Sequence, residues 1–136
     1  MFHSSAGLLS VTGHAITGLL SVLGFLKKLR NDRFLLVLAG ITCVIAVSEI
    51  MLRSPVYQAK GANGTDMLLS PFVYVSLYAL SRKLYKRKFG VEPTYKRSAF
   101  YDPEDKRRQN VFDVIVHVAP MMIALILPFI ITAFAQ

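Results

Sequence analysis

The chain has one cysteine, Cys43, and no tryptophan. An internal disulfide, a dithiol redox pair and a thiolate-rich metal site each need at least two sulfur atoms from one chain, so the sequence excludes all three. It also contains no glycine-rich phosphate loop, no His-Glu-x-x-His motif and no serine nucleophile with a base at a recognisable spacing. We therefore expect a protein that is not an enzyme and that binds no metal.

Charged residues are scarce, and the scarcity is local. They make up 18% of the chain, against about 25% in soluble domains, while apolar residues reach 54%. Residues 1–26 contain no Asp, Glu, Lys or Arg, and residues 34–52 and 114–136 contain only Glu49 of these four types. Apolar blocks of about 20 residues match the thickness of the hydrocarbon core of a bilayer. The pattern predicts an all-α integral membrane protein, with residues 1–136 forming one domain.

Four transmembrane helices are predicted, over about residues 5–30, 33–53, 67–89 and 103–135. The alternative is three spans plus one amphipathic helix in the headgroup plane, because the small and polar residues of the first helix gather on one side. The transmembrane position is favoured, because that side has no cationic residue before Lys27, whereas helices on a membrane surface are usually rich in them.

Capping residues indicate where these helices begin and end. Asn31 suits the left-handed position after a helix, and Asp32 suits the N-cap of the next one. Gly90 predicts the end of the third helix in the same way. Asp102 followed by Pro103 predicts the start of a fourth helix that continues into the bilayer.

Positive charge is concentrated in two segments. Of the 16 basic residues, four lie in residues 27–33 and ten in residues 82–108. The positive-inside rule puts both segments on the cytoplasmic or matrix side of a bacterial or mitochondrial inner membrane, with both chain termini on the other side. Because spans flank the basic loop 82–108, anionic lipids or an acidic protein are better partners for it than nucleic acid. The candidate contact residues are Arg82, Lys83, Lys86, Arg87, Lys88, Lys106, Arg107 and Arg108.

Ionisable groups inside a bilayer cost about 2.5–3.5 kcal/mol each on insertion scales, so they are candidates for function. The four such residues are His14, Glu49, Asp113 and His117. Each also has an ordinary structural interpretation. His14 can form a hydrogen bond between helices, Glu49 can pair with Arg53 four residues on, and the carboxylate of Asp113 can pair with the imidazole of His117.

Haem ligation by two histidines fits the sequence poorly. Ligands of one haem should lie at similar depth, whereas His14 falls near the middle of its span and His117 falls near the inner boundary of its own. No cofactor is therefore expected, and a membrane anchor that holds haem or quinone is kept as an alternative.

Small and polar residues form a stripe along the first helix, which suits close packing against another membrane helix. The stripe consists of Gly7, Ser10, His14, Thr17, Ser21 and Gly24. The leading hypothesis is a non-catalytic small subunit of a larger inner-membrane complex, of respiratory, photosynthetic, secretion or motor type. It would dock on other membrane subunits through this helix and the basic loop. A second hypothesis is a small homo-oligomeric transporter or channel, with His14 and Glu49 along its path.

Overall fold

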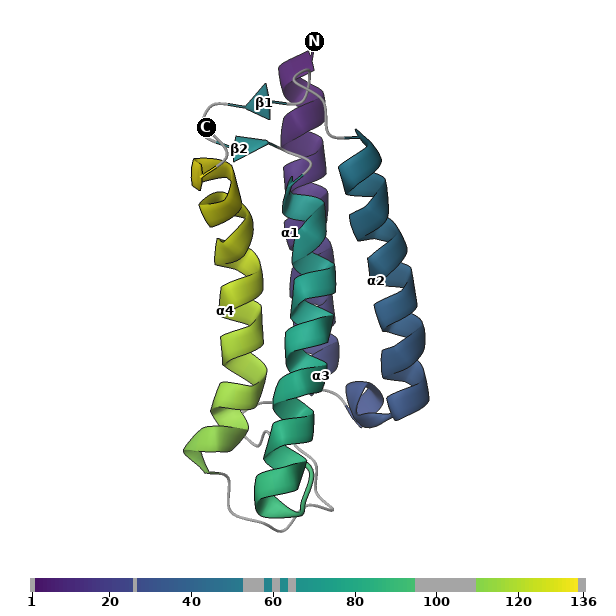
Figure 1. Ribbon diagram of the computed structural model, residues 1–136, viewed down its shortest axis with the longest axis vertical. Helices are drawn as coiled ribbons and strands as arrows, with labels where there is room; N and C mark the ends of the chain where they lie inside the picture. Colours follow the sequence, from purple (N-terminus) through teal and green to yellow (C-terminus); the bar gives the residue numbers. More distant parts are fainter. Residues whose placement is uncertain are drawn as a thin grey trace.

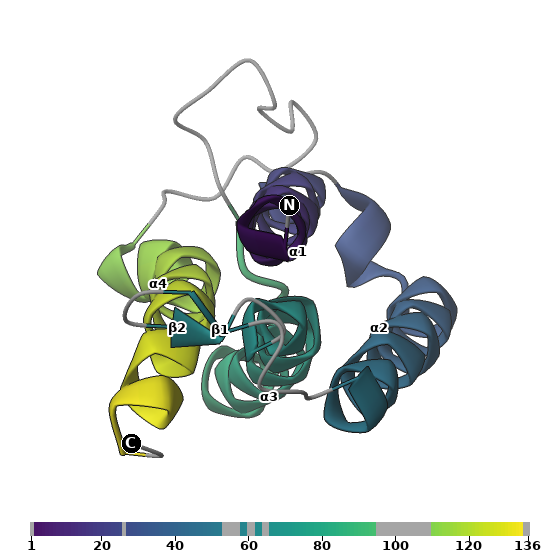
Figure 2. The ribbon, with the colours of Figure 1, turned by 90° about the horizontal axis from the view of Figure 1, so that it is seen from above.

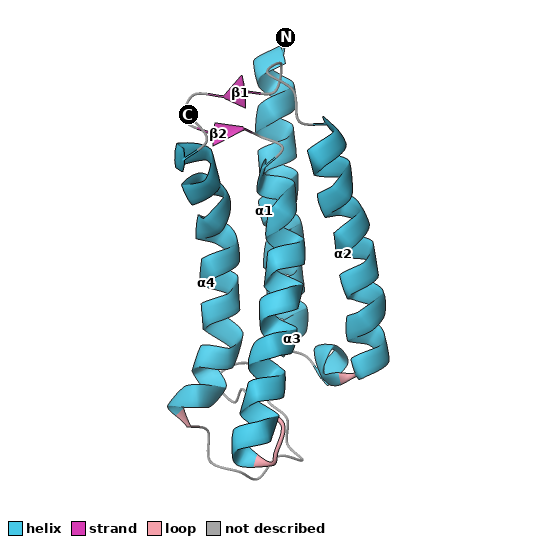
Figure 3. Ribbon diagram, in the orientation of Figure 1, coloured by secondary structure: helices cyan, strands magenta, loops and turns pink. Residues whose placement is uncertain are grey.

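The computed structural model describes residues 2–25, 27–52, 58–59, 62–63, 66–94 and 110–134. Its four α-helices are α1 (Phe2–Phe25), α2 (Asp32–Leu52), α3 (Ser70–Phe89) and α4 (Val111–Phe134). The shorter elements are the 3-10 helices η1 (Lys27–Arg30) and η3 (Asp66–Leu69) and the antiparallel pair β1 (Gln58–Ala59) and β2 (Ala62–Asn63). The described part of the chain is therefore helical, as the sequence predicts, apart from the short antiparallel strand pair (Figure 3).

Helix α3 is the centre of the bundle. It packs against α4, α1 and α2, and α1 also contacts α4 (Figure 2). The face of α3 that turns inward carries Tyr74, Val75, Tyr78 and Tyr85, all of which belong to the hydrophobic core. The most polar of the four helices is thus the one that its neighbours cover.

Within the described residues, two helices are long and apolar enough to cross a membrane, α2 over Asp32–Met51 and α4 over Val111–Ile131. Only 22% and 28% of these segments is buried, whereas the core helix of a soluble protein is mostly buried. Large exposed apolar surfaces mark contact with lipid or with another protein. Two candidate spans therefore support a membrane location. Four spans are not confirmed, because the described part of α1 offers only the shorter apolar segment Val11–Val22, and α3 ends in a basic half.

Polar side chains lie inside the bundle. The buried polar and charged residues are Thr17, Ser21, Thr42, Glu49, Ser70, Arg82, Thr94, Asp113 and His117. Several hydroxyls bond to carbonyl oxygens of their own helix, as Thr42 does by donating to Leu38 O at 2.9 Å. Such local bonds allow a hydroxyl to be buried without a partner on another helix. Buried polar side chains together with a largely apolar outer surface are expected of a helical bundle surrounded by lipid.

Close contact between α1 and η3 depends on Gly13. A Cβ atom built at this position would lie 2.2 Å from the carbonyl oxygen of Met67, which is main chain and cannot turn aside. Thr17, one turn further along α1, is also fully buried and donates to Gly13 O at 2.9 Å. This face of α1 therefore packs within the chain itself.

The turn before α2 differs from the sequence prediction. Asn31 Oδ1 accepts hydrogen bonds from the main-chain N–H of Arg33 (3.0 Å) and Phe34 (3.4 Å). Asn31 is therefore the N-cap, Asp32 is the first helical residue, and no described non-glycine residue has a positive φ. At the end of α3 the prediction is confirmed, because Gly90 has φ 70° and donates its N–H to Lys86 O at 2.9 Å.

Helix α4 begins at Val111, later than predicted, because Asn110 and Asp113 form a reciprocal cap. Asn110 Oδ1 accepts from the N–H of Asp113 at 2.9 Å, and Asp113 Oδ2 accepts from the N–H of Asn110 at 2.8 Å. This is a capping box with an aspartate at the third helical position. The cap predicted at Asp102 and Pro103 lies outside the described residues.

The basic segments lie together in space. Figure 1 places η1, the C-terminal end of α3 and the N-terminal end of α4 at one end of the bundle, and both chain termini with β1 and β2 at the other. We call the first of these the basic end, because η1 reads Lys-Lys-Leu-Arg and the last turn of α3 contains Lys86, Arg87 and Lys88.

Candidate functional site

The main polar feature of the basic end is an ionic network that joins α2 to α3. Arg82 donates from Nη1 to Asp32 Oδ1 at 2.6 Å, and from Nε and Nη2 to the two carboxylate oxygens of Glu92 at 2.8 and 2.7 Å. Arg82 Nη2 also donates to the carbonyl oxygen of Arg30 in η1. Lys86 Nζ lies 2.7 Å from Glu92 Oε1. We call Asp32, Arg82, Lys86 and Glu92 the Arg82 cluster.

The cluster is held by an unusually enclosed guanidinium. The Arg82 side chain is 5% exposed, whereas Asp32 is 82% exposed and Glu92 is 32% exposed. An arginine presents a planar fork that can satisfy a carboxylate with two parallel bonds, as it does here with Glu92. The network thus fixes η1, α2, α3 and the chain after Gly90 to one another.

The charges of the cluster stabilise each other. Hydrogen bonding to Glu92 raises the pKa of Arg82, although burial opposes this. Burial by itself would raise the pKa of Glu92, but the hydrogen bonds from Arg82 and Lys86 outweigh it and hold that pKa below its ordinary value of 4.5. Both groups are therefore charged at neutral pH.

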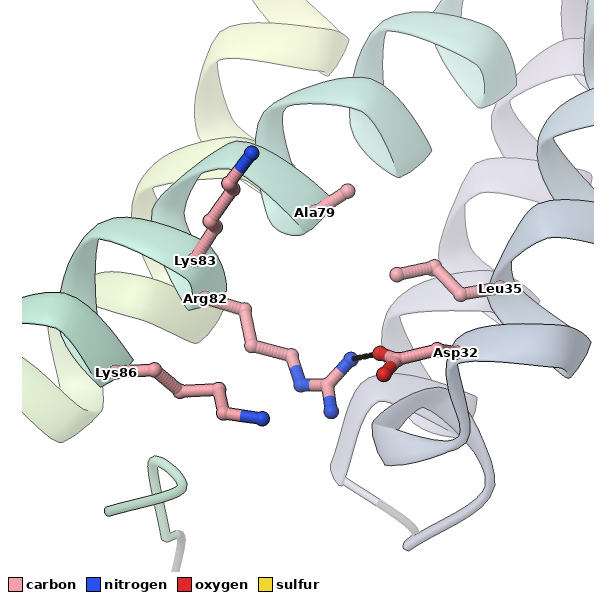
Figure 4. A pocket seen from close by; sticks show the side chains of 6 residues that line it. All are labelled: Asp32, Leu35, Ala79, Arg82, Lys83 and Lys86. Carbon is pink, nitrogen blue, oxygen red and sulfur yellow. Dashed lines mark hydrogen bonds and ion pairs between the residues drawn. The ribbon is translucent and has the colours of Figure 1, made fainter. Parts of the chain in front are cut away.

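A groove of about 400 Å³ lies beside the cluster, between α2 and α3. Leu35 and Ala79 supply its apolar walls, and the charged lining residues are Asp32, Arg82, Lys83 and Lys86. Figure 4 shows Arg82 reaching from α3 to Asp32, with Lys83 extending away from that pair. The groove therefore combines apolar walls with a charged rim of three cationic side chains and one carboxylate.

The predicted basic contact residues therefore fall into different environments. Arg82, predicted as a contact for lipid or an acidic partner, is buried and holds α2 and α3 together. Lys83, Arg87 and Lys88 are exposed, and Lys88 lies over the ring of Phe112 at 4.4 Å from its centroid. Lys86 pairs with Glu92, and Lys106, Arg107 and Arg108 lie outside the described residues.

Asp113 and His117 meet through the main chain. The Asp113 carboxylate caps α4 and also accepts from the N–H of Thr94 at 3.0 Å. The contact that joins the pair is between His117 Nδ1 and Asp113 O, at 2.8 Å. Since a carbonyl oxygen can only accept, this ring nitrogen carries a proton and donates. The His117 ring also lies edge-on to Tyr78, with centroids 5.7 Å apart, so both residues are part of the packing between α3 and α4.

His14 and His117 lie far apart along the bundle. The His14 ring is 5.9 Å from the ring of Phe129, and Phe129 is about 18 Å further along α4 than His117 at 1.5 Å per residue. The two histidines therefore cannot ligate the same haem. Among the described residues, no group of three or more His, Cys, Asp or Glu side chains is placed to hold a metal ion.

The other predicted positions are also placed. Glu49 is buried near the far end of α2, and Arg53, its expected partner, lies outside the described residues. In the α1 stripe, Thr17 and Ser21 are buried and His14 is half-buried against the chain's own helices, while nothing is described of the side chains of Gly7, Ser10 and Gly24. The surface that α1 leaves open to a partner therefore includes the side around Gly18, which has open space in front of it.

Sequence reasoning did not find the Arg82 cluster or the capping box. The box had a usable signal, since Asn-x-x-Asp directly before an apolar run is a start pattern for a helix. Glu92 carried a weaker one, as a single acid following a basic run.

Comparison with protein-family models, curated proteins and solved structures finds no match for this chain.

Proposed function

We propose that this protein is a non-catalytic small subunit of a larger inner-membrane protein complex. It binds other membrane subunits through the outward faces of α2 and α1, and its basic end lies at the cytoplasmic or matrix surface among anionic headgroups. The observation that carries the proposal is the exposed face of α2 around Gly40.

Helix α2 lies at the edge of the bundle and exposes most of its apolar side chains. The exposed ones are Phe34, Leu36, Val37, Ile41, Val44, Val47, Ile50 and Met51. Lipid tails would satisfy such a surface equally well. Gly40 is different, because it leaves the α2 backbone uncovered and nothing lies within 4 Å of where its Cβ would be. Membrane helices associate at small residues, which let two backbones approach closely.

Replacing Gly40 by leucine is the test of this proposal. The variant is expected to lose most of its co-purification with partner subunits after mild detergent extraction, because the new side chain fills the gap that a partner helix would enter. The isolated chain should become more stable, by about 1 kcal/mol, since leucine is a better helix former than glycine and meets no neighbour here.

Two control variants make the result specific. Val114→Leu adds bulk at an exposed position of α4, outside the faces that the proposal uses, and should leave co-purification unchanged. Gly13→Ala should instead destabilise the isolated chain, because its Cβ would collide with Met67 O. Full co-purification of Gly40→Leu would refute docking at this face.

Topology is open to a direct measurement. The variants are Lys28→Cys and Lys88→Cys, each made in a Cys43→Ala background. Both should react with an impermeant maleimide from the same side of sealed vesicles, the side that corresponds to the cytoplasm or matrix. Both positions are exposed and belong to the basic end. Labelling of the two positions from opposite sides, or of both from the outer side, would contradict the proposed orientation.

A further inference from the structure

We propose that the groove between α2 and α3 is a binding site for the phosphate group of an anionic phospholipid. The inference rests on the membrane location in the proposed function and adds to it a defined lipid site. It follows from the charge of the groove, its shape and its height along α2.

The charge of the groove is not balanced. The two positive and two negative groups of the Arg82 cluster cancel, which leaves the amine of Lys83 as the excess charge on the lining. The structure gives Lys83 no ion pair with any carboxylate in the described part of the chain. A phosphodiester carries one negative charge and accepts hydrogen bonds, so it complements the ammonium group of Lys83. Lys86 lines the same groove.

The shape of the groove suits an amphipathic ligand. Its volume of about 400 Å³ falls in the range of small-molecule sites. Leu35 and Ala79 form the apolar part, where the first carbons of an acyl chain would lie, and the charged side chains form the polar part (Figure 4). A free inorganic anion would use only the polar part.

The height of the groove matches the headgroup layer. Asp32 lines the groove and is also the first residue of the candidate span Asp32–Met51 in α2. A site at the start of a span lies where the hydrocarbon core gives way to headgroups. Basic pockets between helices on the cytoplasmic or matrix side are typical binding places for anionic headgroups.

The experiment measures lipid binding to the purified chain in detergent by native mass spectrometry. Phosphatidylglycerol is expected to form a one-to-one adduct, and phosphatidylcholine to bind more weakly. Lys83→Gln should weaken phosphatidylglycerol binding about fivefold, which corresponds to the loss of one basic residue near a membrane surface. Lys83→Arg should restore the affinity. Arg87→Gln removes the same charge from an exposed position of α3 that does not line the groove, and should bind as the native chain does.

Three results would overturn the site. Equal losses in Lys83→Gln and Arg87→Gln would mean that the whole basic surface attracts lipid without a defined site. An unchanged affinity in Lys83→Gln would exclude the groove. Displacement of the lipid by an equal concentration of inorganic phosphate would identify a general anion site in place of a headgroup site. Since partner subunits are absent from this measurement, none of these results bears on docking at Gly40.

Discussion

Replacing Arg82 by methionine should lower the free energy of unfolding by about 3 kcal/mol, because removing one member of a buried ion pair leaves the others without their counter-charge. Arg82 is buried and bonds to two carboxylates and to the carbonyl oxygen of Arg30. Glu92 and Asp32 are partly or largely exposed and regain water, which keeps the loss at the lower end for buried pairs. Denaturant or thermal unfolding in detergent, followed by circular dichroism, measures the change.

A matched control is Lys86→Met, which removes another cation from the same Glu92. Lys86 is about half exposed, so this loss should stay within about 1 kcal/mol. Similar destabilisation in the two variants would show that Arg82 has no special role in joining α2 to α3.

Acid should reveal the same network. The folded-state pKa of Glu92 lies below the unfolded value, so its contribution to stability is fully present above pH 4.5 and is lost as the pH falls through the folded pKa. The native chain should therefore lose stability over this range. The Arg82→Met variant should lose less stability over the same pH range, because the hydrogen bond from Arg82 that lowers the pKa of Glu92 is gone. An equal acid dependence in both proteins would contradict this assignment.

Asp113→Ala is expected to cost about 2–3 kcal/mol, through the main-chain donors that it leaves without an acceptor. The buried carboxylate accepts from Asn110 N–H at the start of α4 and from Thr94 N–H in the segment after α3. An unsatisfied buried donor costs about 1–3 kcal/mol, and loss of an N-terminal cap interaction adds to this.

Asp113→Asn is the informative companion to the alanine variant. Its amide keeps one accepting oxygen, so its free energy of unfolding should lie between those of Asp113→Ala and the native chain. Unfolding of both variants at the native midpoint would refute the capping role.

The existence of the four helices follows from local properties of the sequence. Runs of apolar residues favour helices, and a glycine ends a helix, through interactions within a few residues of sequence. The structure confirms the predictions made from these signals, which are the four helices and the end of α3 at Gly90. The start predicted at Asp102 and Pro103 lies outside the described residues, and within them α4 begins at Val111. A reciprocal bond between Asn110 and Asp113 sets the helix boundary at Val111.

The Arg82 cluster was beyond local reasoning for a different reason. Asp32 and Arg82 are 50 residues apart, and their contact depends on how α2 and α3 pack. In the sequence, Arg82 is one of ten basic residues between positions 82 and 108, and nothing marks it as buried. The inward direction of Thr17 and Ser21 was missed similarly, since a stripe of small residues does not show which neighbour it meets.

The central position of α3 has a consequence for how the protein is made. In the membrane arrangement that we propose, α2 and α4 are apolar enough to enter lipid on their own, whereas α3 carries Arg82 and a basic last turn. Each such charge opposes partition of a lone helix into the bilayer. During synthesis α3 emerges before α4, whose Val116 and Ala124 belong to the core that covers it. In that arrangement, stable integration of α3 depends on its packing against α4, so α3 is held in the bilayer only once α4 has been translated.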